Sequence, residues 1–293
     1  MKILISDAFS EDLPKRLSEF CTVTENRNDF QDADIILVRS ATKVDRAFID
    51  SAKKMKMVIR GGVGLDNIDV EYCSQKGIAV KNTPEASTIA VAELVFALML
   101  GITRNITKAH GSMKNGQWNK DLKGSELYGK TLGIVGLGRI GTEVAKRAKA
   151  FGMKVLACEI NKKQSEYAEI VGMDEIFRRS DFMSLHVPLT DETKEMINRK
   201  SIKKMKDGVV LINTARGKLV NENDLADALK SGKIGYAGLD VYQQEPPAGS
   251  PLLLLDNVLL MPHLGAQTSE NMERIGNIVY EIIRDFRKAN PKL

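Results

Sequence analysis

Cysteine is scarce in this sequence. The 293 residues include three cysteines, Cys21, Cys73 and Cys158, and their spacing matches neither disulfide pairs nor a metal-ligand set. We therefore expect free thiols, no bound metal and a reducing, cytoplasmic environment. Aromatic residues make up only 5% of the chain, and its formal charge of +5 is spread without a basic block. These features argue against a nucleic-acid or membrane partner.

Long apolar runs are missing as well. The N-terminal run at 3–5 is too short for a signal peptide, and the stretch 89–102 is interrupted by Glu93 and too short to cross a bilayer. Residues 87–110 instead predict one long helix that is apolar around most of its circumference, as in a buried helix. We expect no membrane segment.

Short apolar runs alternate with helical stretches along the chain, which is typical of parallel βα folds. The predicted strands of the first part cover residues 3–5, 22–24, 35–38, 57–59 and 78–80. Those of the second part cover residues 131–135, 154–158, 182–185, 209–212, 236–239 and 258–261. A chain of 293 residues is about twice the usual domain length and predicts two cores.

A glycine motif follows the strand predicted at 131–135. Gly136, Gly138 and Gly141 precede helical spacing over 140–151. The first glycine permits a tight turn, the second lets backbone N–H groups approach a pyrophosphate, and the third lets helix and strand pack closely. The sequence therefore predicts a dinucleotide site.

Glu159 ends the next predicted strand, about twenty residues beyond the glycines. A carboxylate at this place accepts hydrogen bonds from ribose hydroxyls and favours NAD over NADP. Lys162 and Lys163 follow closely and leave NADP open.

Two loops in the first part of the chain follow predicted strands. One runs from Arg39 to Lys43, and the other runs from Arg60 to Gly64 through two further glycines. Ligands of parallel sheets lie beyond the carboxyl ends of the strands, so these are the expected substrate loops. The alternative is that both arginines mark the points where strands reach solvent.

Hydride transfer at a carbon bearing a hydroxyl group needs a carboxylate anchor, a proton acceptor and a group that tunes that acceptor. Of the three histidines, His263 lies in a glycine-containing loop after a predicted strand and is the preferred general base. Arg216 and Glu245 follow other predicted strands and suit the remaining two roles. A packing histidine and a solvated loop glutamate remain the alternatives.

Four ordered motifs, at residues 136–141, 213–217, 240–246 and 262–265, together resemble the D-isomer-specific 2-hydroxyacid dehydrogenases. Within that family, residues 38–44, 82–84 and 127–133 most resemble the phosphoglycerate dehydrogenases. The resemblance runs from about residue 35 to residue 268, and it implies a short form without the C-terminal regulatory domain that many of these enzymes carry.

The resemblance implies two Rossmann-like or flavodoxin-like α/β domains, each a parallel sheet flanked by helices, joined by two crossing helices around a cleft. Residues 1–97 with 269–293 would form the substrate-binding domain, and residues 98–268 the NAD-binding domain. Arg216 would bind the substrate carboxylate, His263 would exchange the hydroxyl proton, and Glu245 would orient and charge that histidine. The implied substrate contacts are Arg39, Ser40, Arg60, Gly62, Val63 and Gly64.

The implied NAD contacts are Gly136, Gly138, Arg139, Ile140, Gly141, Glu159, His186, Val187, Pro188, Thr193, Thr214, Ala215, Arg216, Asp240, His263, Gly265 and Ala266. The family usually has Asp where this chain has the longer Glu159, so the charge argument holds while the contact geometry differs.

The resemblance further implies NAD-dependent oxidation of 3-phospho-D-glycerate to 3-phosphohydroxypyruvate, the first step of serine biosynthesis, by a homodimer. A glyoxylate or hydroxypyruvate reductase, or another D-2-hydroxyacid dehydrogenase, uses the same three groups and is the alternative enzyme. An NAD-sensing corepressor-like binding protein shares the architecture and is the alternative from another class.

Overall fold

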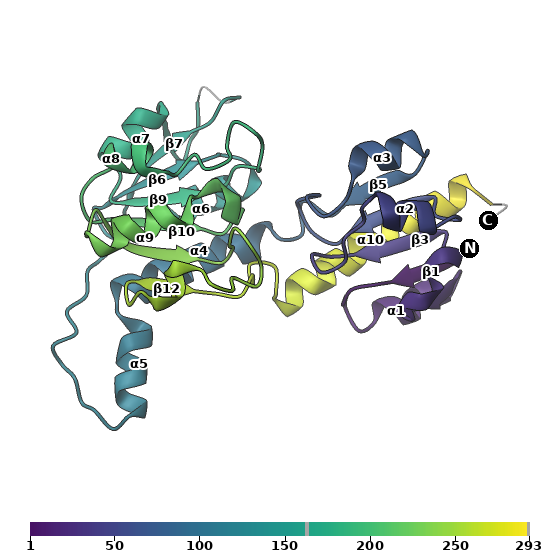
Figure 1. The fold of residues 1–293 in the computed structure, drawn as a ribbon, viewed down its shortest axis with the longest axis horizontal. Coiled ribbons are helices and arrows are strands. Elements are labelled where there is room, and N and C mark those ends of the chain that lie inside the picture. The colour runs from purple at the N-terminus through teal and green to yellow at the C-terminus, as the bar shows by residue number, and fades with distance from the viewer. Residues whose placement is uncertain (162–163, 292–293) are drawn as a thin grey trace. The chain divides into compact units, whose positions relative to one another are not determined.

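The chain divides into two units, Met1–Ser87 with Ala266–Leu293, and Thr88–Gly265. The computed structural model describes residues 1–161 and 164–291 (Figure 1). The chain passes between the units twice, at Ser87–Thr88 and at Gly265–Ala266.

The first unit is built on a five-stranded parallel sheet in the order β2-β1-β3-β4-β5. Its strands are β1 (Lys2–Ile5), β2 (Thr22–Thr24), β3 (Ile35–Val38), β4 (Met57–Arg60) and β5 (Ala79–Asn82). The chain runs from β1 to β2 on one side of β1 and then from β2 to β3 on the other side, so the strand order reverses between β1 and β3. Such a reversal opens a crevice at the carboxyl edge of a parallel sheet.

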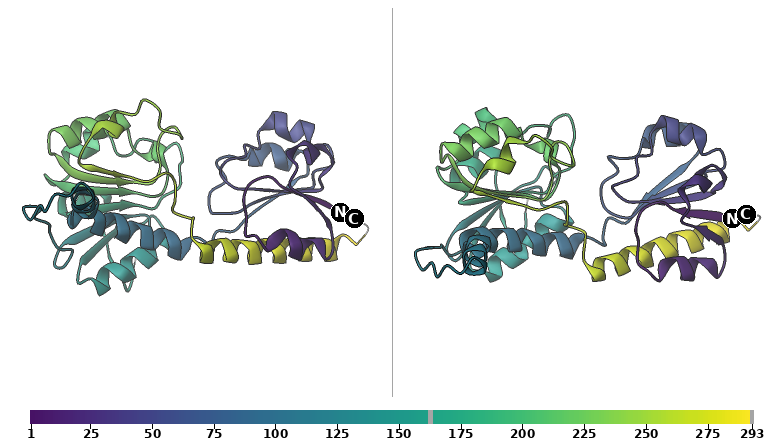
Figure 2. Two further views of the ribbon diagram at one scale, coloured as in Figure 1. Left: turned by 90° about the horizontal axis from the view of Figure 1, so that it is seen from below. Right: turned by 60° about the horizontal axis from the view of Figure 1, so that its bottom comes forward.

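Helices cover both faces of this first sheet. One core contains Leu13 of α1 (Leu13–Ser18) with Ile275 and Val279 of α10 (Ser269–Ala289), and Figure 2 shows these two helices side by side. The other core contains Ile49 of α2 (Arg46–Ser51) and Cys73 of α3 (Val70–Gln75). A short 3₁₀ segment, η1 (Arg27–Asp32), precedes β3.

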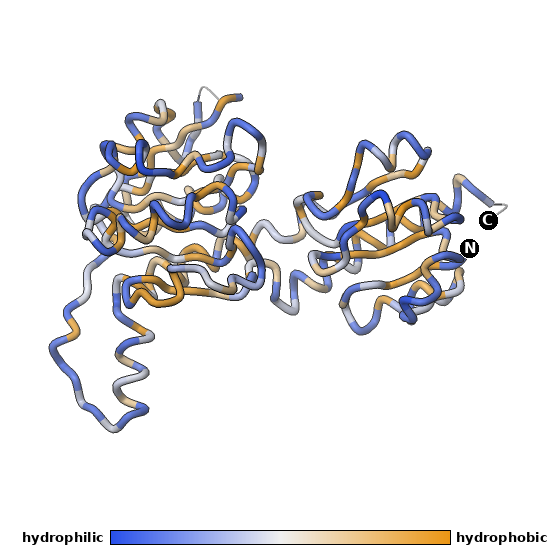
Figure 3. The backbone as a smooth tube through the Cα atoms, in the orientation of Figure 1, coloured by the Kyte–Doolittle hydropathy of each residue, from blue (hydrophilic) through white to orange (hydrophobic). Residues whose placement is uncertain are grey.

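Local sequence sets the limits of α10. The side chain of Thr268 accepts a hydrogen bond from the Asn271 N–H and so satisfies one of the free donors of the first turn. Ile275, Val279 and Ile283 recur every four residues and are fully buried. The resulting apolar stripe packs on the sheet of the first unit, whose central strands are mostly hydrophobic (Figure 3). Asn277 and Glu281, which lie between these residues along the helix, are exposed.

The second unit holds a seven-stranded parallel sheet in the order β12-β11-β10-β9-β6-β7-β8. Its strands are β6 (Thr131–Val135), β7 (Lys154–Cys158), β8 (Glu169–Ile170), β9 (Phe182–Leu185), β10 (Val209–Asn213), β11 (Ile234–Leu239) and β12 (Val258–Leu260). The order reverses between β6 and β9, as in a dinucleotide-binding sheet. The fold class predicted from the sequence, two parallel-sheet α/β units, is confirmed.

Helices again cover both faces. One core includes residues of α7 (Met173–Arg179), α8 (Arg199–Lys203) and α9 (Glu222–Lys230), and the other includes residues of α4 (Thr88–Thr103) and α6 (Arg139–Ala150). Two 3₁₀ segments, η2 (Gly217–Leu219) and η3 (Pro251–Leu254), complete the unit. The two-residue strand β8 carries too short a pattern to be predicted from sequence.

The helix expected over residues 87–110 is two helices. The first, α4, ends at Thr103, and α5 (Ile106–Lys114) begins after Asn105, whose φ of 52° is left-handed and breaks the helical path. Among the described residues no single helix is long and apolar enough to cross a bilayer; α4 and α5 reach that length and composition only jointly, with a bend of 62° between them.

Candidate active site

The glycine motif forms the turn from β6 into α6. Gly136 has a φ of 93°, and a Cβ atom there would lie 2.7 Å from the carbonyl oxygen of His186. A Cβ on Gly141 would overlap the carbonyl oxygen of Gly136, so both positions exclude larger residues. A Cβ on Gly138 would meet no atom within 4 Å, so the space above this backbone is open. A tight turn with an open middle at a helix start fits the pyrophosphate of NAD.

Glu159 follows β7 and turns back over this loop. Its Oε2 atom accepts a 2.8 Å hydrogen bond from the backbone N–H of Leu137. The carboxylate therefore lies beside the glycine turn, where it would repel the extra phosphate of NADP. Lys162 and Lys163, which left NADP open, lie outside the described residues.

His186 follows β9 next to the glycine turn. Its Nε2 atom is 2.8 Å from the Ser184 hydroxyl oxygen. Desolvation by the surrounding protein lowers the pKa of His186 to about 4, so the ring is neutral near pH 7. His110 lies on the exposed side of α5. Neither histidine competes with His263 as a general base.

Further predicted cofactor residues lie near the carboxyl ends of β9 and β10. Thr193 donates a 2.7 Å hydrogen bond from its hydroxyl to the carbonyl of Pro188, and Val187 packs against one core of the unit. Thr214 is buried, and its hydroxyl has no hydrogen-bond partner among the residues described.

Arg216 follows β10 in a loop that is fixed by its neighbours. The Asn213 amide donates a 2.9 Å hydrogen bond to the Arg216 carbonyl, and Arg216 Nη1 donates to the carbonyl of Ala215 at 2.6 Å. Gly217 packs directly on the backbone of Tyr242, where a Cβ atom would overlap the Tyr242 carbonyl. This contact brings the Arg216 loop against the loop that carries Glu245.

Glu245 and His263 form a hydrogen-bonded pair. The distance from Glu245 Oε2 to His263 Nδ1 is 2.7 Å, and the other carboxylate oxygen accepts from the Tyr242 N–H at 3.2 Å. Burial would raise the pKa of Glu245, but the hydrogen bond and charge of His263, the Tyr242 N–H and the charge of Arg216 together lower it below its ordinary value. Glu245 is therefore ionised at neutral pH, and because it binds Nδ1 it leaves Nε2 of His263 for a substrate.

Asp240 binds the backbone of the loop that carries His263. The two oxygens of this carboxylate accept from the backbone N–H groups of Leu264 at 2.6 Å and Gly265 at 2.8 Å. Burial raises the pKa of Asp240 despite these two bonds. The loop is strained, because His263 has a φ of 57°. Strained backbone at a non-glycine residue concentrates at functional sites.

Sequence reasoning missed the part played by Tyr242. Its hydroxyl donates a 2.9 Å hydrogen bond to the carbonyl of Met261, which ties the Glu245 loop to the strand end before His263. Its place two residues after Asp240 was the available signal.

The predicted substrate loops of the first unit both follow sheet strands. Arg60 folds its guanidinium over Gly62, where a Cβ atom would overlap it and where the φ of 147° favours glycine. Asn82 donates a 2.6 Å hydrogen bond to the carbonyl of Val63. Ala266 also lies in this unit, and its carbonyl accepts from the Asn271 amide at 2.7 Å.

Arg39 follows β3, beside the exposed Ser40. Burial lowers the pKa of its guanidinium, an effect that the charge of Asp7 partly offsets. Its Nε atom is buried and has no hydrogen-bond partner among the described residues, and Nη1 donates to Gln267 Oε1 at 3.3 Å. A desolvated cation with an unused donor fits an anionic ligand.

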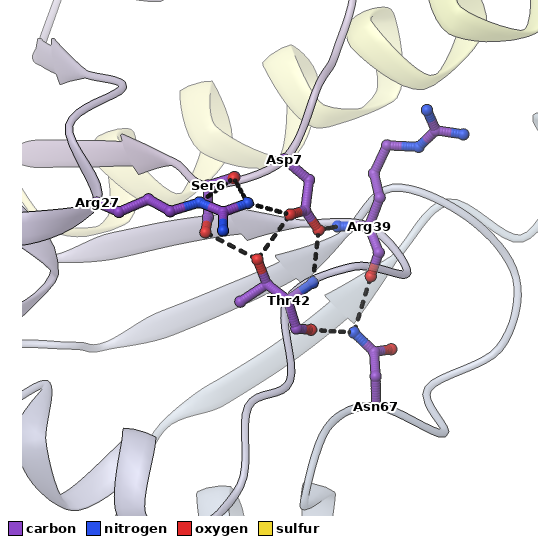
Figure 4. Close-up of polar contacts among 6 residues, drawn as sticks. All are labelled: Ser6, Asp7, Arg27, Arg39, Thr42 and Asn67. Atoms are coloured by element: carbon purple, nitrogen blue, oxygen red, sulfur yellow. Dashed lines mark hydrogen bonds and ion pairs between the residues drawn. The ribbon is translucent and has the colours of Figure 1, made fainter. Parts of the chain in front are cut away.

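Asp7 and Asn67 are residues of this loop cluster that sequence reasoning did not single out. Both contact the segment 39–43, as Figure 4 shows. Asp7 comes just after β1, at the reversal of the strand order, and that position was the signal that could have found it. Over residues 1–161 and 164–291, no group of three or more His, Cys, Asp or Glu could hold a metal ion.

Comparison with known proteins identifies the family of this chain. Residues 96–265 match the family model described as D-isomer specific 2-hydroxyacid dehydrogenase, NAD binding domain. A protein of Methanocaldococcus jannaschii named D-3-phosphoglycerate dehydrogenase is 48% identical over 97% of this chain and 57% of its own length. The chain thus spans little more than half of that relative. A Thermotoga maritima protein named hydroxypyruvate reductase is 50% identical over 87% of this chain and 85% of its own length.

A solved structure of the same fold is also similar to this chain. The crystal structure of D-lactate dehydrogenase from Aquifex aeolicus complexed with NAD and lactic acid matches with a TM-score of 0.89 at 32% identity, over 99% of this chain and 96% of that one. The cofactor is NAD, because the matched family model describes an NAD-binding domain and the Aquifex structure was determined with NAD. The chain belongs to the D-isomer-specific 2-hydroxyacid dehydrogenase family.

Proposed function

We propose that this protein oxidises 3-phospho-D-glycerate to 3-phosphohydroxypyruvate with NAD. The observation that carries the reaction type is the 2.7 Å pair of Glu245 and His263, which lies beside the Arg216 loop and in the same unit as the glycine turn. NAD supplies the hydride acceptor. His263 Nε2 takes the proton of the C2 hydroxyl, and Glu245 stabilises the imidazolium that results. Arg216 binds the substrate carboxylate with its planar guanidinium.

The phosphorylated substrate is supported by the first unit. Arg39 follows β3 and Arg60 ends the neighbouring strand β4. The Arg39 guanidinium keeps a buried Nε donor without a partner among the described residues. We assign these two side chains, with Ser40 and the backbone of 62–64, to the anionic end of the substrate. The name of the Methanocaldococcus relative supports the same substrate.

The second candidate is reduction of hydroxypyruvate. It is favoured by the Thermotoga relative of that name, which this chain matches over 85% of the relative's length rather than over little more than half. The same Arg, Glu and His groups serve this reaction in the opposite direction, with His263 donating the proton.

NADH formation at 340 nm with 3-phosphoglycerate, beside NADH oxidation with hydroxypyruvate and glyoxylate, decides between them. We expect NAD-linked oxidation of 3-phosphoglycerate, far slower turnover with NADP, and no turnover by His263→Ala. Activity on the unphosphorylated acids alone would refute the phosphoglycerate assignment and leave the second candidate. An NADH-binding protein without turnover of any of the three acids would refute both and favour a sensing role.

We also propose a homodimer of cytoplasmic location. The segment that follows α5 leaves the body of the second unit, and its Trp118 is 73% exposed (Figure 1). Met113 on α5 is 53% exposed, so α5 and the segment that follows it carry apolar surface that a second copy would cover. Light scattering should give twice the chain mass, and Trp118→Asp should give one chain mass.

The cytoplasmic location is supported by the cysteines. All three are free, which fits a reducing compartment.

A further inference from the structure

The loop after β3 in the first unit is held from two sides. On one side lies Asp7, whose Oδ2 accepts from the backbone N–H groups of Arg39 at 2.5 Å and Thr42 at 3.1 Å. Asp7 Oδ1 accepts from the Thr42 hydroxyl at 2.6 Å. On the other side lies Asn67, whose amide donates to the carbonyls of Arg39 at 2.8 Å and Thr42 at 2.6 Å (Figure 4).

The carboxylate in this cluster is almost fully enclosed. The Asp7 side chain is only 5% exposed, and Arg27 Nη2 lies 3.2 Å from its Oδ1. Arg27 also donates to the Ser6 carbonyl at 2.8 Å, and the hydroxyls of Ser6 and Thr42 are 2.9 Å apart. A buried carboxylate with this many donors is ordered, and Arg27 reduces its repulsion of a nearby anion.

Asp7 and Asn67 bind the two ends of the loop but not the backbone N–H groups in its middle. The backbone N–H groups of Ser40 and Ala41 donate no hydrogen bond within the part of the chain that the structure describes. Together with the Nε atom of Arg39 they form a set of donors without acceptors. The loop lies at the reversal between β1 and β3, where parallel sheets bind ligands.

We propose that Asp7 and Asn67 are positioning residues that hold segment 39–43 in the conformation that binds the substrate anion. Asp7 fixes the N–H groups at both ends of the turn and Asn67 fixes the two carbonyls, so the donors of Arg39, Ser40 and Ala41 are ordered before the substrate arrives. Such ordering in advance removes an entropic cost from binding. The inference rests on the proposed function, since it assigns the role of this loop in that reaction.

Asp34 provides a matched control for Asp7. Its carboxylate is also largely buried, at 16% exposure, and accepts from the Lys2 N–H at 2.8 Å and Lys56 Nζ at 2.9 Å. These partners begin β1 and precede β4, so Asp34 lies at the amino edge of the same sheet, opposite the loop. Asn257 is the control for Asn67, because its amide bridges the carbonyls of Leu229 and Gly235 in the second unit.

The experiment compares KM, kcat and the NADH dissociation constant for Asp7→Ala and Asn67→Ala with those for Asp34→Ala and Asn257→Ala. We expect the first pair to raise KM for 3-phosphoglycerate about tenfold or more, with kcat and NADH affinity changed less than about twofold. The control pair should leave KM within about twofold of the wild type. Asp7→Asn keeps an oxygen for the two N–H groups and should recover most of the lost affinity. Equal KM values for Asp7→Ala and Asp34→Ala would overturn the proposal.

Hydrogen–deuterium exchange provides a readout that needs no turnover. Segment 39–43 should exchange faster in Asp7→Ala than in the wild type and in Asp34→Ala, and unchanged exchange would overturn the proposal. If the wild type acts only on hydroxypyruvate, the substrate assignment fails, and the KM comparison with hydroxypyruvate decides the role of Asp7. If no substrate is turned over, the proposed function fails, and the exchange comparison alone decides whether Asp7 orders the loop.

Discussion

Replacing Glu245 by Gln tests the central pair of the site. The substitution keeps the shape of the side chain and an oxygen that can accept from His263 Nδ1, but it removes the charge 2.7 Å away. During oxidation His263 takes the proton of the C2 hydroxyl and becomes positively charged. Without the carboxylate the protonated ring loses its charged partner, so the transition state that leads to it is less stable.

The size of the loss follows from the hydrogen bond. A bond to a charged partner contributes about 1.5–3 kcal/mol and a neutral one about 0.5–1.5 kcal/mol, so the variant loses about 1 kcal/mol. The His263 and Glu245 side chains are 36% and 38% exposed, and solvent screening keeps the loss from being larger. A loss of about 1 kcal/mol in the transition state lowers kcat/KM about fivefold.

The assay is kcat/KM for 3-phosphoglycerate from pH 5.5 to 9.5, with hydroxypyruvate as the substitute if only that acid is turned over. Glu222→Gln is the control, because Glu222 accepts from the Gln243 N–H at 2.7 Å and the Ser250 hydroxyl at 2.6 Å but contacts no histidine. Its kcat/KM should match that of the wild type. A kcat/KM for Glu245→Gln equal to that of the control, at equal thermal stability, would refute the role assigned to the pair.

Two further predictions concern binding and stability. Arg216→Lys should lower kcat/KM about a hundredfold, because a planar two-pronged donor is lost at the reacting centre, while NADH affinity in a fluorescence titration changes little; parallel loss of both would indicate misfolding. Asp181 is partly buried, which raises its pKa, but the hydrogen bonds from Lys206 Nζ at 2.5 Å and the Thr131 N–H at 2.8 Å outweigh burial and hold that pKa below its ordinary value. Because its folded-state pKa is lowered, the ionised Asp181 stabilises the protein above about pH 4, and this stabilisation is lost as the pH falls through the folded-state pKa. Asp181→Asn should therefore lower the free energy of unfolding in urea by about 1–2 kcal/mol at pH 7, and by progressively less toward pH 3. A cost that is independent of pH would contradict this sign.

Local patterns predicted the elements of this fold well. The apolar run at 131–135 became β6, and the helical spacing over 140–151 became α6 with its first residue at Arg139. Both depend on short-range periodicity, which the sequence displays directly. The long helix predicted over 87–110 was wrong at its end, because the left-handed Asn105 breaks it and no local breaker such as proline marks that point.

What the sequence by itself determined is the set of chemical groups and the order in which strands deliver them: the glycine turn, Arg216, Glu245 and His263. Only the tertiary structure decided their partners. The strand order places Asp240 under the His263 loop, desolvates His186, and places Asp7 against a loop more than thirty residues further along the chain. These contacts join segments far apart in sequence. Which segments meet follows from the order of the strands in the two parallel sheets, and that order depends on the packing of whole domains, which no short stretch of sequence reveals.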